Sequence, residues 1–251
     1  MAFAHDAELS IATAAVDAAV AVLSAEAGGF ATLSSDGRDI KSEADLQSEA
    51  AMLEVIRANS DIPVLSEEAG ADDTAAQAEA IWVVDPLDGT MNFMRGLPAC
   101  CTCAALIVNG HPVLGVVHDL VHDERWVGGT DLPTTCNGNP VQASACAALD
   151  QAVLSTGFPR TFEFTAEAMD LFTRRMASVK KVRMIGAAAM SLAWASGGRV
   201  DLHAESRTFL WDIAAGVALV EGAGGTVLMS NVDEQWRCDV VAGAPALVSL
   251  F

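Results

Sequence analysis

The sequence predicts a layered α+β fold in which sheets and helices alternate, as one domain of two closely packed halves, roughly 1–140 and 141–251. Two kinds of signal predict it. The Asn-Gly pair at 109–110 joins two apolar runs and is typical of a hairpin turn. Helical segments separate other strands, which is typical of crossovers between layers. The 251 residues are 52% hydrophobic, enough to bury one large core or two smaller ones.

The first half begins with helices and continues with hairpins. Residues 6–27 are rich in alanine and typical of a helix, and the apolar repeat between 46 and 56 predicts a second helix. A turn-rich stretch, 28–38, separates them. Apolar runs then predict strands at 62–65, 81–84, 102–109 and 112–120, and a further hairpin brings in 125–128.

The second half alternates strands with helices. A helix that carries Arg174 and Arg175 is predicted between two strands, and a small-residue helix stops at glycines 197–198. Trp211 and Asp212 open a strongly apolar helix. The other predicted elements are strands 151–158, 182–185, 199–204 and 226–229, and helix 187–196.

The charge of the chain argues against two classes of partner. With 14 basic and 33 acidic residues the formal net charge is -19, so nucleic acid and anionic membranes would repel it. The first basic residue is Arg38, so the start lacks the basic segment of a secretory signal. Four acids interrupt the first helix and are taken to rule out a membrane span: Asp6, Glu8, Asp17 and Glu26. We expect a soluble, cytoplasmic protein.

The six cysteines show neither zinc-type spacing nor a dense disulfide framework. Three of them lie in one apolar run between 100 and 103, where buried thiols acting as small hydrophobic residues are expected.

The stretch 81–93, IWVVDPLDGTMNF, is the most informative part of the chain. Four apolar residues predict a strand buried on both faces, and Pro86 is expected to end its ladder because proline has no N–H. Asp85 and Asp88 follow, and two such acids raise each other's pKa unless a cation lies between them. The alternative is an ordinary turn, with Asp88 capping a helix and Gly89 supplying backbone freedom.

Further acids occupy equivalent positions and favour a metal site. Glu67 follows strand 62–65, and Asp212 opens a helix, so all these acids lie at strand ends or helix starts, where ligands bind in layered folds. Only oxygen donors are offered, which indicates Mg²⁺ or Mn²⁺. Gly89 and Thr90 add backbone N–H groups at a helix start, an anion site. Metal and anion sites side by side indicate a phosphate ester, attacked by metal-activated water.

A phosphatase with a covalent aspartyl intermediate is the competing interpretation. Haloacid-dehalogenase-type phosphatases carry D-x-D-G-T, with the first aspartate as nucleophile. Here the spacing is D-x-x-D-G-T, and Pro86 stands two residues before Asp88. No nucleophile is therefore available at that place.

The motifs DPLDGTMNF (85–93), WDIAAG (211–216) and SEEAG (66–70) resemble the inositol monophosphatase family of Mg²⁺-dependent, lithium-inhibited phosphatases. The resemblance covers nearly the whole chain. It implies a five-layer αβαβα sandwich, a homodimer and a small phosphate ester as substrate. It also implies two or three Mg²⁺ ions, held by Glu67, Asp85, the Leu87 carbonyl, Asp88 and Asp212.

The resemblance implies the remaining roles as well. Asp45 with Thr90 would activate the attacking water, the third metal would reach Glu67 through water, and Gly89 and Thr90 would hold the phosphate. Two positions depart from the family's pattern: Ser34 replaces a frequent lysine, and Lys41-Ser42 replaces the usual Val-Thr.

Substrate choice follows from the same comparison. The residues Met91-Asn92-Phe93 have the form found in inositol phosphatases, and a polyol would be bound by Asp88, Gly186, Ala187, Ala188 and Glu205. A solvated loop acid is the alternative for Glu205.

Three alternatives stay open. Five basic residues within 174–183 would suit a second phosphate, as in 3′-phosphoadenosine 5′-phosphate or fructose 1,6-bisphosphate, although charge runs are usually solvated. An alternative of another class is a non-catalytic metal-binding regulator.

Overall fold

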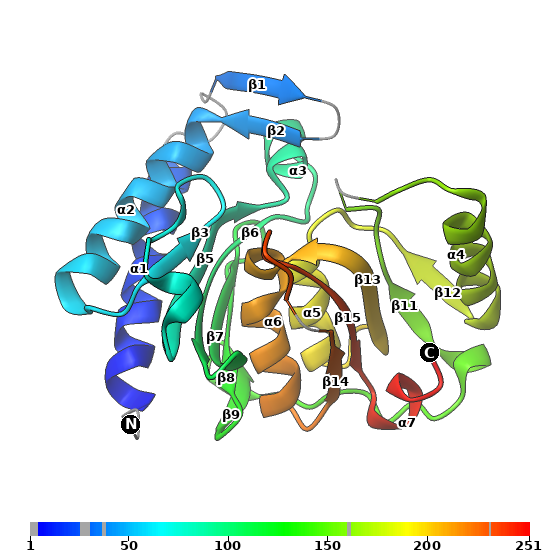
Figure 1. Cartoon of the computed structure of the whole chain (residues 1–251). Coiled ribbons are helices and arrows are strands. Elements are labelled where there is room, and N and C mark those ends of the chain that lie inside the picture. The colour runs from blue at the N-terminus through cyan, green and yellow to red at the C-terminus, as the bar shows by residue number, and fades with distance from the viewer. Residues whose placement is uncertain (1–4, 26–30, 37–38, 160–161, 231) are drawn as a thin grey trace.

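The computed structural model describes residues 5–25, 31–36, 39–159, 162–230 and 232–251 (Figure 1). Parts of the predicted turn-rich stretch, 28–30 and 37–38, lie outside the described residues. The described part forms a hairpin of strands β1 (Thr32–Asp36) and β2 (Asp39–Ser42). The prediction of turns was therefore wrong for 32–36.

Helices and sheets alternate in five layers, as Figure 1 shows. Helices α1 (His5–Ala25) and α2 (Glu43–Asn59) form the first layer and cover one face of an eight-stranded sheet. Helices α5 (Ala188–Ser196) and α6 (Leu210–Gly222) fill the middle layer. A five-stranded sheet follows, and α4 (Ala166–Ser178) lies outside it. The layered α+β class and the αβαβα order are confirmed.

Each sheet is built from one half of the chain. The first has the order β10-β9-β8-β7-β6-β5-β3-β4 and the second β12-β11-β13-β15-β14. The first comprises β3 (Val64–Ser66), β4 (Gly70–Ala71), β5 (Ala80–Asp88), β6 (Cys101–Val108), β7 (His111–Asp119), β8 (Glu124–Gly129), β9 (Leu132–Cys136) and β10 (Asn139–Pro140). The second comprises β11 (Val153–Ser155), β12 (Lys181–Arg183), β13 (Leu202–Phe209), β14 (Thr226–Met229) and β15 (Arg237–Gly243). Short helices complete the fold: α3 (Thr90–Arg95) and α7 (Pro245–Val248).

Strand β5 is buried on both faces, as its sequence predicts. Trp82 and Val84 pack into the cluster under α1 and α2, whereas Ile81 and Val83 pack into the cluster around α5 and α6. The strand does not end at Pro86, so that prediction was wrong. Its ladder with β6 skips Pro86 and the next residue and resumes at Asp88. Such a bulge bends the strand next to the site it serves.

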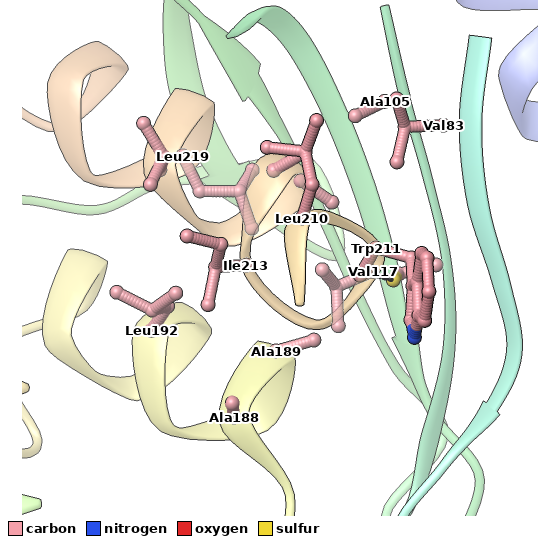
Figure 2. Close-up of a cluster of buried hydrophobic side chains, with 14 of the residues drawn as sticks. Val83, Ala105, Val117, Ala188, Ala189, Leu192, Leu210, Trp211, Ile213 and Leu219 are labelled. Carbon is pink, nitrogen blue, oxygen red and sulfur yellow. Dashed lines mark hydrogen bonds between the residues drawn. The ribbon is translucent and has the colours of Figure 1, made fainter. Parts of the chain in front are cut away.

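The middle layer is packed through small residues (Figure 2). A Cβ on Gly115 of β7 would lie 2.2 Å from the Ala215 carbonyl oxygen, and one on Gly216 would lie 2.3 Å from Leu192 Cβ. These glycines let α6 lie directly on the first sheet and on α5. Trp211 of α6 reaches the sheet beside Val117, as Figure 2 shows. The close packing fixes the start of α6, which carries an acidic residue of the candidate site.

Helix α1 shows why the membrane argument from its acids was too simple. Among the described residues it is long and apolar enough for a membrane span by length and composition alone, so the acids do not exclude one. In this fold, α1 packs against α2 and the first sheet. Ala12, Ala15, Val16 and Ala19 are fully buried against α2 and the first sheet.

Candidate active site

A pocket of about 230 Å³ collects the candidate residues from both halves of the chain. It lies where the ends of β3 and β5 meet the starts of α3, α5 and α6. Eleven of the twelve residues predicted for the site line it: Glu67, Asp85, Leu87, Asp88, Gly89, Thr90, Gly186, Ala187, Ala188, Glu205 and Asp212. The twelfth, Asp45, is 1% exposed and lies behind Thr90.

Asp85 is the most deeply placed acid of the pocket. Its side chain is 1% exposed and its Oδ1 accepts a 2.9 Å hydrogen bond from the Leu87 N–H. Burial raises its pKa well above the usual range, and the charges of Glu67, Asp88 and Asp212 raise it further. An acid in this environment is stabilised by a cation.

Asp88 is held by the start of α5. Its Oδ2 accepts the Ala189 N–H at 2.8 Å, and the Cys101 thiol lies 3.7 Å away. The helix dipole favours a negative charge there. Burial nevertheless raises the pKa of Asp88 to about 7, and the charge of Asp212 adds to the rise. In the described residues no basic side chain is ion-paired with Asp85 or Asp88.

Gly89 is required by the turn between β5 and α3. Its φ of 85° lies in the left-handed region, and a Cβ would be 2.7 Å from the Ala99 carbonyl oxygen. Gly89 caps α3 in place of Asp88, which corrects the helix-cap alternative. The first N–H groups of a helix have no partner within it, so those at 89 and 90 are suited to an anion.

Asp45 is a buried acid that connects two parts of the site. Its Oδ2 accepts from the N–H and the hydroxyl of Ser42 at 2.7 and 2.6 Å, which fixes the start of α2. Its Oδ1 lies 2.9 Å from Thr90 Oγ1, which is also 3.1 Å from the Leu87 carbonyl oxygen. Burial raises the pKa of Asp45. The Thr90 hydroxyl is thereby held between two acceptors.

Glu49 is a residue that the sequence analysis missed. It is 6% exposed, and its Oε1 accepts the N–H groups of Glu68 and Ala69, each at 3.0 Å, and the Ser66 hydroxyl. These groups flank Glu67 on both sides, so Glu49 fixes the turn that presents Glu67. The detectable signal was an acid on the buried face of α2.

A second tie to the same turn involves Lys41, a departure from the family's pattern. Its ammonium group pairs with the carboxylate of Glu68, whose side chain is 4% exposed. Burial raises the pKa of Glu68. The pair joins the β1–β2 hairpin to the turn that carries Glu67. The Ser34 side chain lies outside the described residues.

The opposite wall comes from the second half. Asp212, in the first turn of α6, accepts a 3.2 Å hydrogen bond from the Thr208 hydroxyl. Glu205 is half-buried, and burial raises its pKa to about 8, with smaller contributions from Asp212 and Asp88. A Cβ on Gly157 would lie 2.6 Å from Glu205 Oε1, so this glycine leaves room for the carboxyl group. Glu205 is therefore not a solvated loop acid.

Two residue groups lie differently from expectation. Asn92 is buried, and its amide donates to the carbonyls of Ala99 and Ile185 at 2.7 Å each, so it ties α3 to the loop before Gly186 instead of facing substrate.

The basic segment 174–183 is spread over the surface. Arg175 is partly buried and lines a pocket beside α4, whereas the other four basic residues are exposed.

The donor set fits a hard divalent cation. Five carboxyl groups and the Leu87 carbonyl line the pocket, and burial and then mutual repulsion raise the pKa values of Asp85 and Asp88. Their side chains are not already gathered as ligands: within the described ranges, no three His, Cys, Asp or Glu side chains form a ready-made metal-binding group.

This layered α+β fold, with a pocket of carboxylates between its two halves, is shared by a family of phosphatases. The model of the inositol monophosphatase family matches residues 5–245. Inositol-1-monophosphatase from Synechocystis is 36% identical over 228 residues, covering 87% of this chain and 77% of the relative. A Thermotoga maritima fructose-1,6-bisphosphatase/inositol-1-monophosphatase is 32% identical over 191 residues, covering 76% and 71%.

Solved structures agree. The inositol monophosphatase from Anabaena superposes with a TM-score of 0.84 at 33% identity, covering 97% of this chain and 92% of that one. The chain therefore belongs to the inositol monophosphatase family, and it is a phosphoric monoester hydrolase that acts on small phosphate esters.

Proposed function

We propose that the protein is a Mg²⁺-dependent phosphomonoesterase that hydrolyses inositol monophosphate or a similar sugar or polyol phosphate. The observation that supports this most strongly is Asp85. Burial and then three neighbouring acids raise its pKa, and its Oδ1 accepts a hydrogen bond from the Leu87 N–H.

The metal ligands in this proposal are Glu67, Asp85, the Leu87 carbonyl, Asp88 and Asp212. They would hold two or three Mg²⁺ ions, with Mn²⁺ as a substitute. The ions supply, when bound, charge stabilisation of the phosphate and a lowered pKa for the attacking water. Neutralising the acids of this pocket also removes the repulsion that raises the pKa of Asp85.

The chain's own residues then orient the reaction. The Thr90 hydroxyl has one proton to donate, and Asp45 Oδ1 at 2.9 Å accepts it. The hydroxyl oxygen takes a proton from the attacking water as it passes its own proton to Asp45 Oδ1, so Asp45 both orients the hydroxyl and receives the proton. The N–H groups of Gly89 and Thr90 hold the phosphate oxygens.

The polyol is bound on the other wall. Burial raises the pKa of Glu205 to about 8, and its carboxyl group is the hydrogen-bonding partner for the hydroxyls of the polyol. Asp88 lines the same pocket, as do Gly186, Ala187 and Ala188 at the start of α5. Small side chains at the start of α5 leave room for a ring.

A bisphosphate is the second candidate, because the Thermotoga relative carries fructose-1,6-bisphosphatase in its name. The scattering of the basic segment 174–183 favours the monophosphate, as does the salt bridge that engages Arg174 with Asp170. An adenosine bisphosphate would need the same basic residues. No observation favours a non-catalytic regulator.

We also infer a cytoplasmic homodimer that binds neither nucleic acid nor membranes. The net charge of -19 supports the last two statements, because both surfaces are anionic.

The test is phosphate release at fixed Mg²⁺ from inositol-1-phosphate, fructose 1,6-bisphosphate and 3′-phosphoadenosine 5′-phosphate. We expect the highest kcat/KM for the inositol ester. A higher value for either bisphosphate would replace the polyol assignment, and no turnover of any ester with metal present would sink the proposed reaction.

A further inference from the structure

A second cavity opens beside the active site. Its volume is about 260 Å³, and it lies between α4, β13 and the C-terminal residue Phe251. Gly157 and Glu205 line both this cavity and the active-site pocket. The two spaces therefore share a wall at Gly157 and Glu205.

The wall that joins the two spaces is aromatic. Phe158 lines the active-site pocket, and its ring centroid lies 4.5 Å from that of Phe172 and 4.8 Å from that of Phe162. Phe162 and Phe172 both line the second cavity. Neither the carboxylate site nor the polyol contacts make use of these rings.

The chemistry of the cavity differs from that of a polyol site. Ala168, Leu171 and Met176 of α4 add apolar surface to the rings, and the Arg175 guanidinium stacks 5.1 Å from the centroid of Phe251. An apolar cavity of about 150 Å³ is already large enough to bind benzene. The present cavity therefore accommodates one aromatic ring, which packs well against phenylalanine edges and faces.

We propose that this cavity is a leaving-group subsite for an aromatic ring, so that the enzyme accepts phosphomonoesters whose alcohol carries such a ring on a short linker. The inference rests on the proposed phosphomonoesterase function. The phosphate lies at Gly89 and Thr90, the linker passes Glu205, and the ring packs on Phe162 and Phe172.

The experiment compares 2-phenylethyl phosphate with ethyl phosphate, because both are esters of primary alcohols and differ by the ring. We expect kcat/KM to be at least tenfold higher for the phenylethyl ester. Ala168→Trp fills the cavity from α4 and should reduce that ratio to within about twofold of one, with kcat/KM for ethyl phosphate unchanged. The matched control is Ala177→Trp, at an exposed position of α4 outside the cavity.

The outcomes separate the two proposals. The subsite alone is overturned if ethyl phosphate is turned over and the ratio of kcat/KM between the phenylethyl and ethyl esters is near one in the unmodified protein. It is also overturned if Ala168→Trp leaves that ratio unchanged. If no ester is turned over, calorimetric titration with 2-phenylethylphosphonate and ethylphosphonate in Mg²⁺ tests the subsite by binding. Tenfold tighter binding of 2-phenylethylphosphonate supports the subsite. Equal binding of the two phosphonates, or no binding of either, overturns it. Ala168→Leu replaces Ala168→Trp if the larger residue prevents folding, with a smaller reduction expected.

Discussion

Replacing Asp88 by asparagine should stabilise the metal-free protein while it removes activity. The pKa of Asp88 is raised from 3.8 to about 7, mainly by burial and then by Asp212. The folded state therefore holds this proton more tightly than the unfolded state. The stability that the proton provides is fully present below pH 3.8 and is lost as the pH rises through 7.

The size of the stabilisation follows from the pKa shift of Asp88. A rise of about three units corresponds to about 4 kcal/mol at pH 8. Because neighbouring acids share the repulsion, we expect Asp88→Asn to recover about 2–4 kcal/mol. The amide oxygen still accepts the Ala189 N–H, so that contact is kept. For a chain of this size the gain raises the Tm by roughly 5–15 °C.

The assay is thermal unfolding at pH 5 and pH 8 in a chelator, with Glu54→Gln on the exposed face of α2 as the matched control. We expect the gain of Asp88→Asn at pH 8 to shrink at pH 5, where Asp88 is already protonated. Added Mg²⁺ should raise the Tm of the unmodified protein more than that of the variant, and the variant's kcat should fall by more than about tenfold because a ligand is lost. An equal or lower Tm for the variant at pH 8 in chelator would refute the reasoning.

Three further predictions concern other parts of the site and core. Glu49→Ala should raise the Mg²⁺ concentration for half-maximal activity at least fivefold, because the turn that carries Glu67 loses its buried hydrogen-bond acceptor. Glu49→Gln should keep this concentration within twofold of that of the unmodified protein. Activity is measured as Mg²⁺ is titrated, and equal half-maximal concentrations for the two variants would remove Glu49 from the site. Gly115→Ala should cost about 1–3 kcal/mol in urea unfolding, because its Cβ meets the Ala215 carbonyl oxygen at 2.2 Å; unchanged stability would contradict this packing. Glu205→Gln should change the ratio of kcat/KM between inositol-1-phosphate and ethyl phosphate, and an unchanged ratio would exclude a contact with the polyol.

Much of the fold could be predicted from local sequence patterns. Strand 226–229 coincides with β14, and the Asn-Gly pair forms the turn predicted for it, with both residues at positive φ. The spacing of apolar residues and the identity of turn residues are local properties, so they predict strands and turns without knowledge of the partner strands. Strand β15, which lies between β13 and β14, was missed. Its sequence, RCDVVAG, mixes polar and apolar residues because only part of the strand is buried.

The site was predictable to the extent that it consists of acids at the ends of elements. All four carboxylates assigned as ligands line one pocket, although their separation in sequence reaches 145 positions between Glu67 and Asp212. What the sequence did not reveal were contacts that depend on tertiary packing. Glu49 acts through a turn far from it in the chain, and Asn92 binds a carbonyl 93 residues away.

The central claim is that the carboxylate pocket becomes a phosphatase site only with a divalent cation. The most direct measurement is inorganic phosphate release from inositol-1-phosphate as Mg²⁺ is titrated into chelator-treated protein. We predict no release without metal and a saturable rise with Mg²⁺, reproduced by Mn²⁺. Release that proceeds at the same rate in excess chelator would contradict the account.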